Sequence, residues 1–217
     1  MNFNDKKIKK VLIKTCLILF FVIIFNHTNP IFNGGIQMQT CKANCDRCET
    51  KRTVNFKGNP LTLIGNEVKT GQKAPDFEVS SNGLAPVKLS NYSGKIKVIS
   101  VVPSLDTPVC DAQTRRFNEE ATKFSKDVAV LTISMDLPFA QARWCGAAGI
   151  KNVETLSDHK LGNFGMAYGV FIAELRLLAR SIFIIDKDDK VVYAEYVPEV
   201  TEHPKYEAVL EALKKIK

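Results

Sequence analysis

Two short runs of β-branched and aliphatic residues, separated by one helical pattern, most restrict how this chain can fold. The runs are Ile96–Val102 and Val128–Ser134, and their composition is typical of strands buried in a sheet. Between them, Phe117, Ala121 and Phe124 recur at spacings of four and three residues, which places them on one face of a helix. The pattern predicts a strand–helix–strand unit in the middle of the chain.

Further elements are expected on both sides of this unit. Residues 53–56 and 61–63 flank the turn-forming residues 57–60 and predict an N-terminal β-hairpin. The elements expected after the central unit are a helix from Pro138 to near Gly149, a hairpin over residues 181–197 and an amphipathic helix from Pro204. This order predicts a three-layer α/β fold of thioredoxin type, with a β-hairpin at its N-terminal end.

Charge separates residues 1–50 from the rest of the chain. The chain has 217 residues and a net charge of +7, and residues 1–50 hold seven of its 30 basic residues but only three of its 23 acidic residues. Residues 51–217 carry mixed charges and no basic stripe with interleaved aromatic residues, so nucleic-acid binding is not expected. We expect residues 51–217 to form one domain, preceded by an extension of residues 1–50.

An apolar segment, residues 11–25, follows the basic cluster Lys6–Lys10. As a helix it spans about 22 Å, less than the roughly 30 Å of a bilayer core, and it resembles the hydrophobic region of a signal peptide. The residues after it contain no small-x-small cleavage site. Two alternatives remain: the segment is an uncleaved membrane anchor, or translation starts near Met38 and the protein is cytoplasmic.

Cys41, Cys45 and Cys48 form a C-x3-C-x2-C pattern that resembles the iron–sulfur signature of radical-SAM enzymes. Three thiolates at this spacing could ligate a cluster or a metal ion. No histidine lies nearby to complete a zinc site, and the domain behind the pattern belongs to another class. We therefore expect a Cys-rich tail without a metal.

Residues 103–110 hold the strongest chemical signal. The predicted strand ends near Pro103, and Thr107 followed by Pro108 has the pattern of an N-cap and first helical position. Cys110 is then the third residue of a helix, where free backbone N–H groups and the helix dipole favour an anion. Because the thiolate is the nucleophile, this position favours a reactive cysteine. The alternative is a buried, inert cysteine in a helix.

Pro103, Thr107 and Cys110 match the P-x3-T-x2-C signature of the peroxiredoxins. Two further segments, Val54–Leu61 and Asp136–Gly146, extend the resemblance, so that residues 52–217 are similar to the bacterial thiol peroxidases. These are the atypical two-cysteine branch of the peroxiredoxins. The segment at residues 168–176 departs from the branch, whose members usually carry a Gly-Pro-containing loop there.

The resemblance implies a role for five residues. Cys110 would attack a hydroperoxide and become a sulfenic acid, and Cys145 would resolve it to an intrachain disulfide. The Thr107 hydroxyl would bind the thiolate and the peroxide, and Pro103 would shield the sulfur from water. Arg180 would be the active-site arginine, with a fixed guanidinium that stabilises the thiolate and polarises the peroxide. Without the resemblance, Arg180 would be a surface arginine and Cys145 a packed helix residue.

The resemblance also implies partners. Hydrogen peroxide and organic hydroperoxides would be the substrates, thioredoxin the reductant, and a homodimer the assembly. The reaction would need no metal, haem or flavin, and both cysteine-bearing helices would unwind locally during it. A thioredoxin-like disulfide reductase is the competing enzyme class, but Thr107 stands where its first cysteine would be. An inert scaffold remains the alternative if Cys110 is unreactive.

Overall fold

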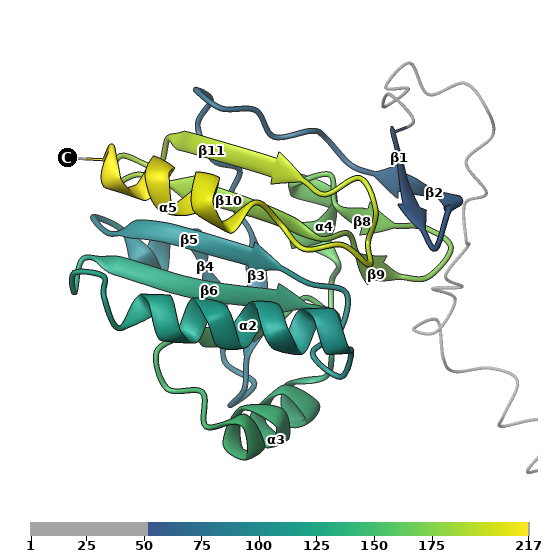
Figure 1. Cartoon of the computed structure of the whole chain (residues 1–217), viewed down its shortest axis with the longest axis horizontal. Helices are drawn as coiled ribbons and strands as arrows, with labels where there is room; N and C mark the ends of the chain where they lie inside the picture. Colours follow the sequence, from purple (N-terminus) through teal and green to yellow (C-terminus); the bar gives the residue numbers. More distant parts are fainter. Residues whose placement is uncertain (1–51, 217) are drawn as a thin grey trace, which may run out of the picture. The chain divides into compact units, whose positions relative to one another are not determined.

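In the computed structural model, which describes residues 52–216, the domain is built around a mixed seven-stranded sheet (Figure 1). Its strands, in spatial order, are β11 (Val191–Tyr196), β10 (Ser181–Ile185), β5 (Ile96–Val101), β6 (Val128–Ser134), β7 (Glu154–Ser157), β3 (Glu78–Ser81) and β4 (Pro86–Lys88). The central pairs β5–β6 and β6–β7 are parallel, and the outer pairs are antiparallel. Each parallel pair is joined by a helix, because parallel neighbours need a long crossover.

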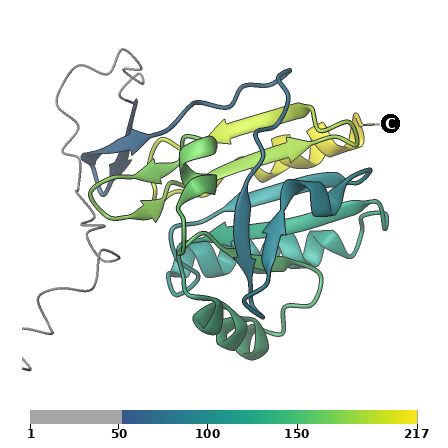
Figure 2. The same ribbon diagram turned by 180° about the vertical axis from the view of Figure 1, so that it is seen from behind.

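The helices lie on both faces of this sheet. They are the 3-10 helix η1 (Leu89–Tyr92), α2 (Pro108–Ala121), α3 (Pro138–Ala148), α4 (Asn163–Ala167) and α5 (Tyr206–Lys214). Helices α2 and α5 cover one face, and Figure 2 shows α4 on the other. The predicted three-layer α/β fold is therefore confirmed.

Alternate residues of β5 explain how one strand serves two cores. Val98 packs with Phe117 of α2 and Val209 of α5. Ile99 faces the other side and joins the cluster that contains Phe164 of α4. Successive side chains of a strand point to opposite faces, so a strand covered on both sides is mostly apolar, and in β5 only Lys97 and Ser100 are polar.

The N-terminal hairpin is confirmed, with strands β1 (Arg52–Phe56) and β2 (Asn59–Ile64) paired antiparallel. Its turn is tighter than residues 57–60, because Lys57 and Gly58 alone form it, both with positive φ as a type I′ turn requires. Pro60 belongs to β2, opposite Asn55, where it needs no N–H for a further strand. Two short strands, β8 (Phe171–Ile172) and β9 (Leu177–Leu178), complete this second sheet.

The start of α2 and both ends of α3 agree with the sequence signals, whereas α2 ends at Ala121, before Phe124, and α5 begins at Tyr206 rather than at Pro204. Thr107 is the N-cap of α2 and Pro108 its first residue, and Pro138 starts α3. Gly149 ends α3 with a φ of 68°, a left-handed conformation that suits glycine. Within residues 52–216, no helix combines the length and apolar character needed to cross a membrane. The predicted apolar segment 11–25 and the Cys41–Cys48 pattern lie outside the described residues.

Asp158, the residue after β7, is almost fully buried and accepts the backbone N–H groups of Phe164 and Gly165 in α4 at 3.2 and 2.8 Å. Burial raises its pKa from 3.8 to about 6, although these N–H groups act to lower it. The folded protein therefore holds this proton more tightly than the unfolded chain between about pH 4 and pH 6. The free energy of unfolding should fall as the pH rises through this window.

We predict that the free energy of unfolding of Asp158→Asn, taken relative to the parent, rises by roughly 2 to 3 kcal/mol between pH 4 and pH 7, because only the parent must lose a proton that its folded state holds. Denaturant unfolding of both proteins under reducing conditions at several pH values would measure this difference. Because other carboxylates titrate equally in both proteins, the difference isolates Asp158. A difference that stays constant from pH 4 to pH 7 would contradict the prediction.

Candidate active site

Cys110 is fully buried in the first turn of α2, as the third helical residue. Its side chain packs with Val102 and Leu105, and Trp144 of α3 lies against the same cluster. The N-cap Thr107 is exposed, and its hydroxyl donates to the Ser104 carbonyl at 3.0 Å. A hydroxyl has one proton, so in this conformation the Cys110 sulfur does not receive it.

Arg180 contacts the sulfur directly. It immediately precedes β10, is 1% exposed, and donates from Nη2 to Cys110 Sγ at 3.3 Å. Its other donors go to Gln113 Oε1 at 2.6 Å and to the Val200 carbonyl at 3.0 Å. None of these three acceptors is a carboxylate, so ionisation of Cys110 would place a negative charge against the buried guanidinium.

Gln113 orients this arginine. It lies one turn after Cys110 on α2, is fully buried, and donates from Nε2 to Ser100 Oγ of β5 at 2.7 Å. The amide is therefore fixed with its oxygen toward Arg180. Gln113 was not predicted as a site residue, although a polar side chain three residues after the cysteine, on the same helix face, was a usable signal.

The N-terminal hairpin supports Arg180 from the other side. Val200, whose carbonyl accepts from Arg180, donates its own N–H to the Asn55 carbonyl of β1 at 2.8 Å. The neighbouring Glu199 accepts the N–H of Gly58 in the hairpin turn at 3.0 Å. That hydrogen bond is the largest of several that lower the pKa of Glu199 to about 2. No local sequence pattern pointed to these contacts.

Tyr206 of α5 lies on the same face of the seven-stranded sheet as α2 and packs in one cluster with Phe117. The Arg116 guanidinium lies 3.9 Å from the centre of its ring, and its hydroxyl contacts His203 Nδ1 at 2.8 Å. Burial raises the pKa of Tyr206, while the charges of Arg116 and Arg180 act to lower it. The start of α5 thus lies within the electrostatic reach of the Arg180 guanidinium.

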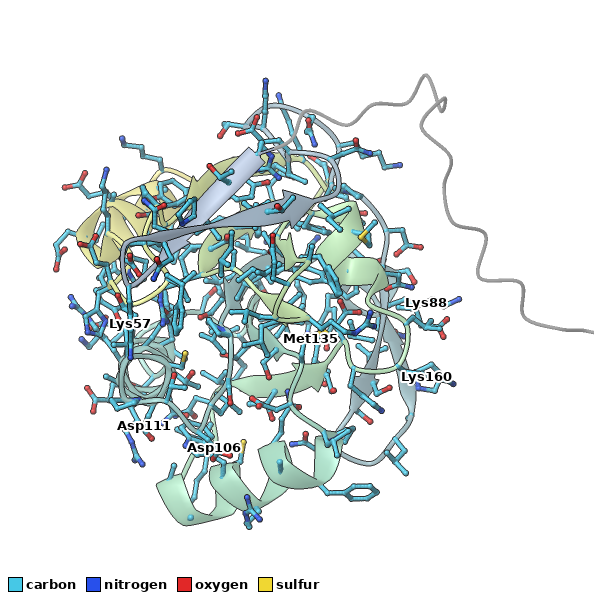
Figure 3. The ribbon with its side chains drawn as sticks, turned by 90° about the vertical axis from the view of Figure 1, so that its right-hand side faces the viewer. Lys57, Lys88, Asp106, Asp111, Met135 and Lys160 are labelled. Carbon is cyan, nitrogen blue, oxygen red and sulfur yellow. The ribbon has the colours of Figure 1, made fainter. Side chains whose placement is uncertain are left out.

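Cys145 occupies a different environment on α3. Its sulfur contacts Thr155 Oγ1 of β7 at 3.3 Å, and its side chain is half-buried at the edge of a groove of about 570 Å³. The preceding residue, Trp144, donates from its indole nitrogen to Asp111 Oδ1 of α2 at 3.1 Å. Figure 3 shows Asp111 on the side of α2 that faces α3.

Cys110 and Cys145 are both free thiols, and the fold keeps them apart. Cys110 contacts Arg180 beside β10, whereas Cys145 contacts Thr155 in β7, with β5 and β6 between those two strands. The two sulfurs are therefore not bonded to each other, and disulfide formation requires each of them to leave its present partner.

Four of the five predicted site residues lie at the Cys110 sulfur or in the loop that leads to it. Cys110 and Arg180 are in contact, Thr107 is the N-cap of the same helix, and Pro103 is buried two residues after the end of β5. Cys145 is the exception, at a separate position on α3. In the part of the chain that the structure describes, no three histidine, cysteine or acidic side chains converge to hold a metal ion.

Comparisons with known proteins agree with this geometry. The redoxin family model matches residues 69–210. The thiol peroxidase of Bacillus subtilis (strain 168) is 63% identical over 161 residues, which cover 74% of this chain and 96% of that protein. The thiol peroxidase of Halalkalibacterium halodurans is 60% identical over 75% of this chain and 97% of that protein. A crystal structure of a peroxiredoxin-like protein from Aquifex aeolicus is similar with a TM-score of 0.71 and 45% identity, over 76% of this chain and 96% of that one.

Proposed function

Because the chain belongs to the redoxin family and is a thiol-dependent peroxidase, we propose that Cys110 is the thiol that attacks the peroxide. The observation that carries this assignment is the hydrogen bond from the buried Arg180 guanidinium to the Cys110 sulfur. The sulfur also lies in the first turn of α2, where backbone N–H groups favour an anion. The thiolate, and not the thiol, is the nucleophilic form of cysteine.

In the proposed first step, the Cys110 thiolate attacks the terminal oxygen of a hydroperoxide. A sulfur–oxygen bond forms and the oxygen–oxygen bond breaks. The leaving oxygen takes a proton from solvent, equivalent to the one that Cys110 lost on ionising, and departs as water or an alcohol. Cys110 is oxidised to a sulfenic acid. Arg180 stabilises the charge that moves onto the leaving oxygen. Pro103 shields the sulfur, and the Thr107 hydroxyl turns from Ser104 to bind the peroxide.

In the proposed second step, Cys145 attacks the sulfenic sulfur, and a disulfide forms as water leaves. The separation of the two thiols supports local unwinding of α2 and α3 before this step. The Trp144–Asp111 hydrogen bond and the Cys145–Thr155 contact must break for Cys145 to travel. Thioredoxin then returns the disulfide to two thiols by exchange, through the groove beside Cys145.

The remaining assignments concern assembly and location. Leu137 and Phe139, at the start of α3, are 55% and 67% exposed, and this exposed apolar surface supports a homodimer in which a second copy would cover it. Residues 51–217 form the peroxidase domain in this proposal, with residues 1–50 as an extension. A membrane anchor at residues 11–25 and a cytoplasmic product starting near Met38 remain the two alternatives for that extension. Detergent partitioning of the full-length chain would distinguish them.

Peptide mass spectrometry tests the cysteine assignments. The reduced protein is treated with one equivalent of cumene hydroperoxide, beside a Cys145→Ser variant. We expect a Cys110–Cys145 disulfide in the parent and a sulfenic or over-oxidised Cys110 in the variant. If both cysteines stay free thiols after brief exposure to peroxide, the assignments are wrong.

A further inference from the structure

We propose that Asp136 is a positioning residue for the peroxide reaction, because it holds the loop that covers Cys110. This inference rests on the proposed role of Cys110 as the attacking thiol. The loop, residues 103–107, joins β5 to α2 and has no regular secondary structure of its own. Its shape therefore depends on what its polar groups bind.

The Asp136 carboxylate binds two consecutive residues of that loop. Ser104 Oγ donates to Oδ1 at 2.7 Å, and the backbone N–H of Leu105 donates to Oδ2 at 2.7 Å. Ser134 Oγ, at the end of β6, also donates to Oδ2 at 2.8 Å. Hydrogen bonds to an ionised carboxylate are about twice as strong as those between neutral groups. One side chain thus ties the loop after β5 to the end of β6.

Each of the two loop contacts positions a residue close to Cys110. Leu105 is 2% exposed and packs in the same cluster as Cys110, so its anchored backbone fixes an apolar side chain beside the thiol. The Ser104 carbonyl accepts both the N–H and the hydroxyl of Thr107, at 3.1 and 3.0 Å. Through Ser104, the carboxylate therefore also sets the N-cap at which α2 begins.

The carboxylate is itself held in place before any substrate arrives. The Asp136 carbonyl accepts the Ser157 hydroxyl of β7 at 2.5 Å, and the Asp136 N–H donates to Ser134 Oγ at 3.3 Å. Side chain and backbone of Asp136 are thus fixed to three neighbouring segments. A displacement of about 1 Å in a reacting group can cost about 100-fold in rate. The contacts of Asp136 hold the loop beside Cys110 against such a displacement.

Two rate constants of the same sulfur test the proposal: oxidation of Cys110 by hydrogen peroxide and alkylation of Cys110 by iodoacetamide. Both are measured in a Cys145→Ser background, with and without Asp136→Ala or Asp136→Asn. We expect Asp136→Ala to slow the peroxide reaction about 10- to 100-fold. Alkylation should stay constant or become faster, because a released loop exposes the buried sulfur. Asp136→Asn keeps an acceptor oxygen, so the peroxide reaction should slow only about fivefold.

The matched control is Asp127→Asn, which removes an exposed carboxylate that pairs with Lys187 and should change neither rate. Two results would overturn the proposal: peroxide and alkylation rates that fall together, or a peroxide rate of Asp136→Ala within about twofold of the parent. Failure of the underlying peroxidase assignment would be distinct from both. In that case Cys110 would not be oxidised even where Asp136 is intact.

Discussion

Replacement of Cys110 by serine is expected to abolish peroxide turnover, with a loss on the order of 10⁴-fold or more. A serine hydroxyl does not ionise at neutral pH and is not oxidised by peroxide, so Arg180 would face a group that cannot attack. Consumption of hydrogen peroxide, with thioredoxin and its reductase supplying electrons, measures the effect. Circular dichroism of the variant checks that the fold is retained.

The Cys145→Ser variant separates the first oxidation of Cys110 from the recycling of the enzyme. Cys145 lies outside the Arg180 contact, so its loss should leave the first oxidation of Cys110 unchanged while stopping recycling by thioredoxin. The variant should then consume about one equivalent of peroxide per chain. If instead Cys110→Ser kept turnover and Cys145→Ser lost the first oxidation, the two roles would be exchanged.

Arg180→Lys is expected to slow the reaction of Cys110 with peroxide by about 10²- to 10³-fold, although the positive charge is kept. An ammonium group cannot reproduce the planar fork that reaches Cys110, Gln113 and Val200 together. The same change should lower the free energy of unfolding by roughly 3 kcal/mol, because buried acceptors lose their donor. Stopped-flow oxidation and denaturant unfolding measure the two effects.

Two further substitutions separate geometry from charge in this prediction. Arg143→Lys on the exposed surface of α3 should change neither quantity. Gln113→Leu should also slow the peroxide reaction, but less, because Arg180 loses one of its three acceptors and keeps its contacts with Cys110 and Val200. An Arg180→Lys enzyme with the parent's rate would show that charge alone is sufficient at this position.

Local signals in the sequence determined most of the elements. The apolar runs of β5 and β6, the Thr107–Pro108 start of α2, and the Pro138 and Gly149 ends of α3 were all predicted. Each depends on residues within a turn or two of one another, because caps and periodicity are local properties. The same local signals placed Cys110 in the first turn of its helix.

Short elements escaped prediction. Strands β8 and β9 have two residues each and α4 has five, too few to show a period. Lys97 is a different case, because its strand was predicted but the full burial of a charged side chain within it was not. Its ammonium group is paired at 2.6 Å with Asp189, 92 positions later in the chain.

The candidate active site, like the fold, depends partly on local sequence and partly on tertiary contacts. The sequence by itself determined where Cys110 sits on its helix and, through family resemblance, named Arg180 and Cys145. Only the tertiary structure decided that Gln113 and Val200 hold Arg180 against the sulfur and that Asp136 holds the covering loop. These contacts join residues 20 to 67 positions apart. Which strands pair and which loops meet at one end of the sheet determines such contacts, so no local pattern encodes them.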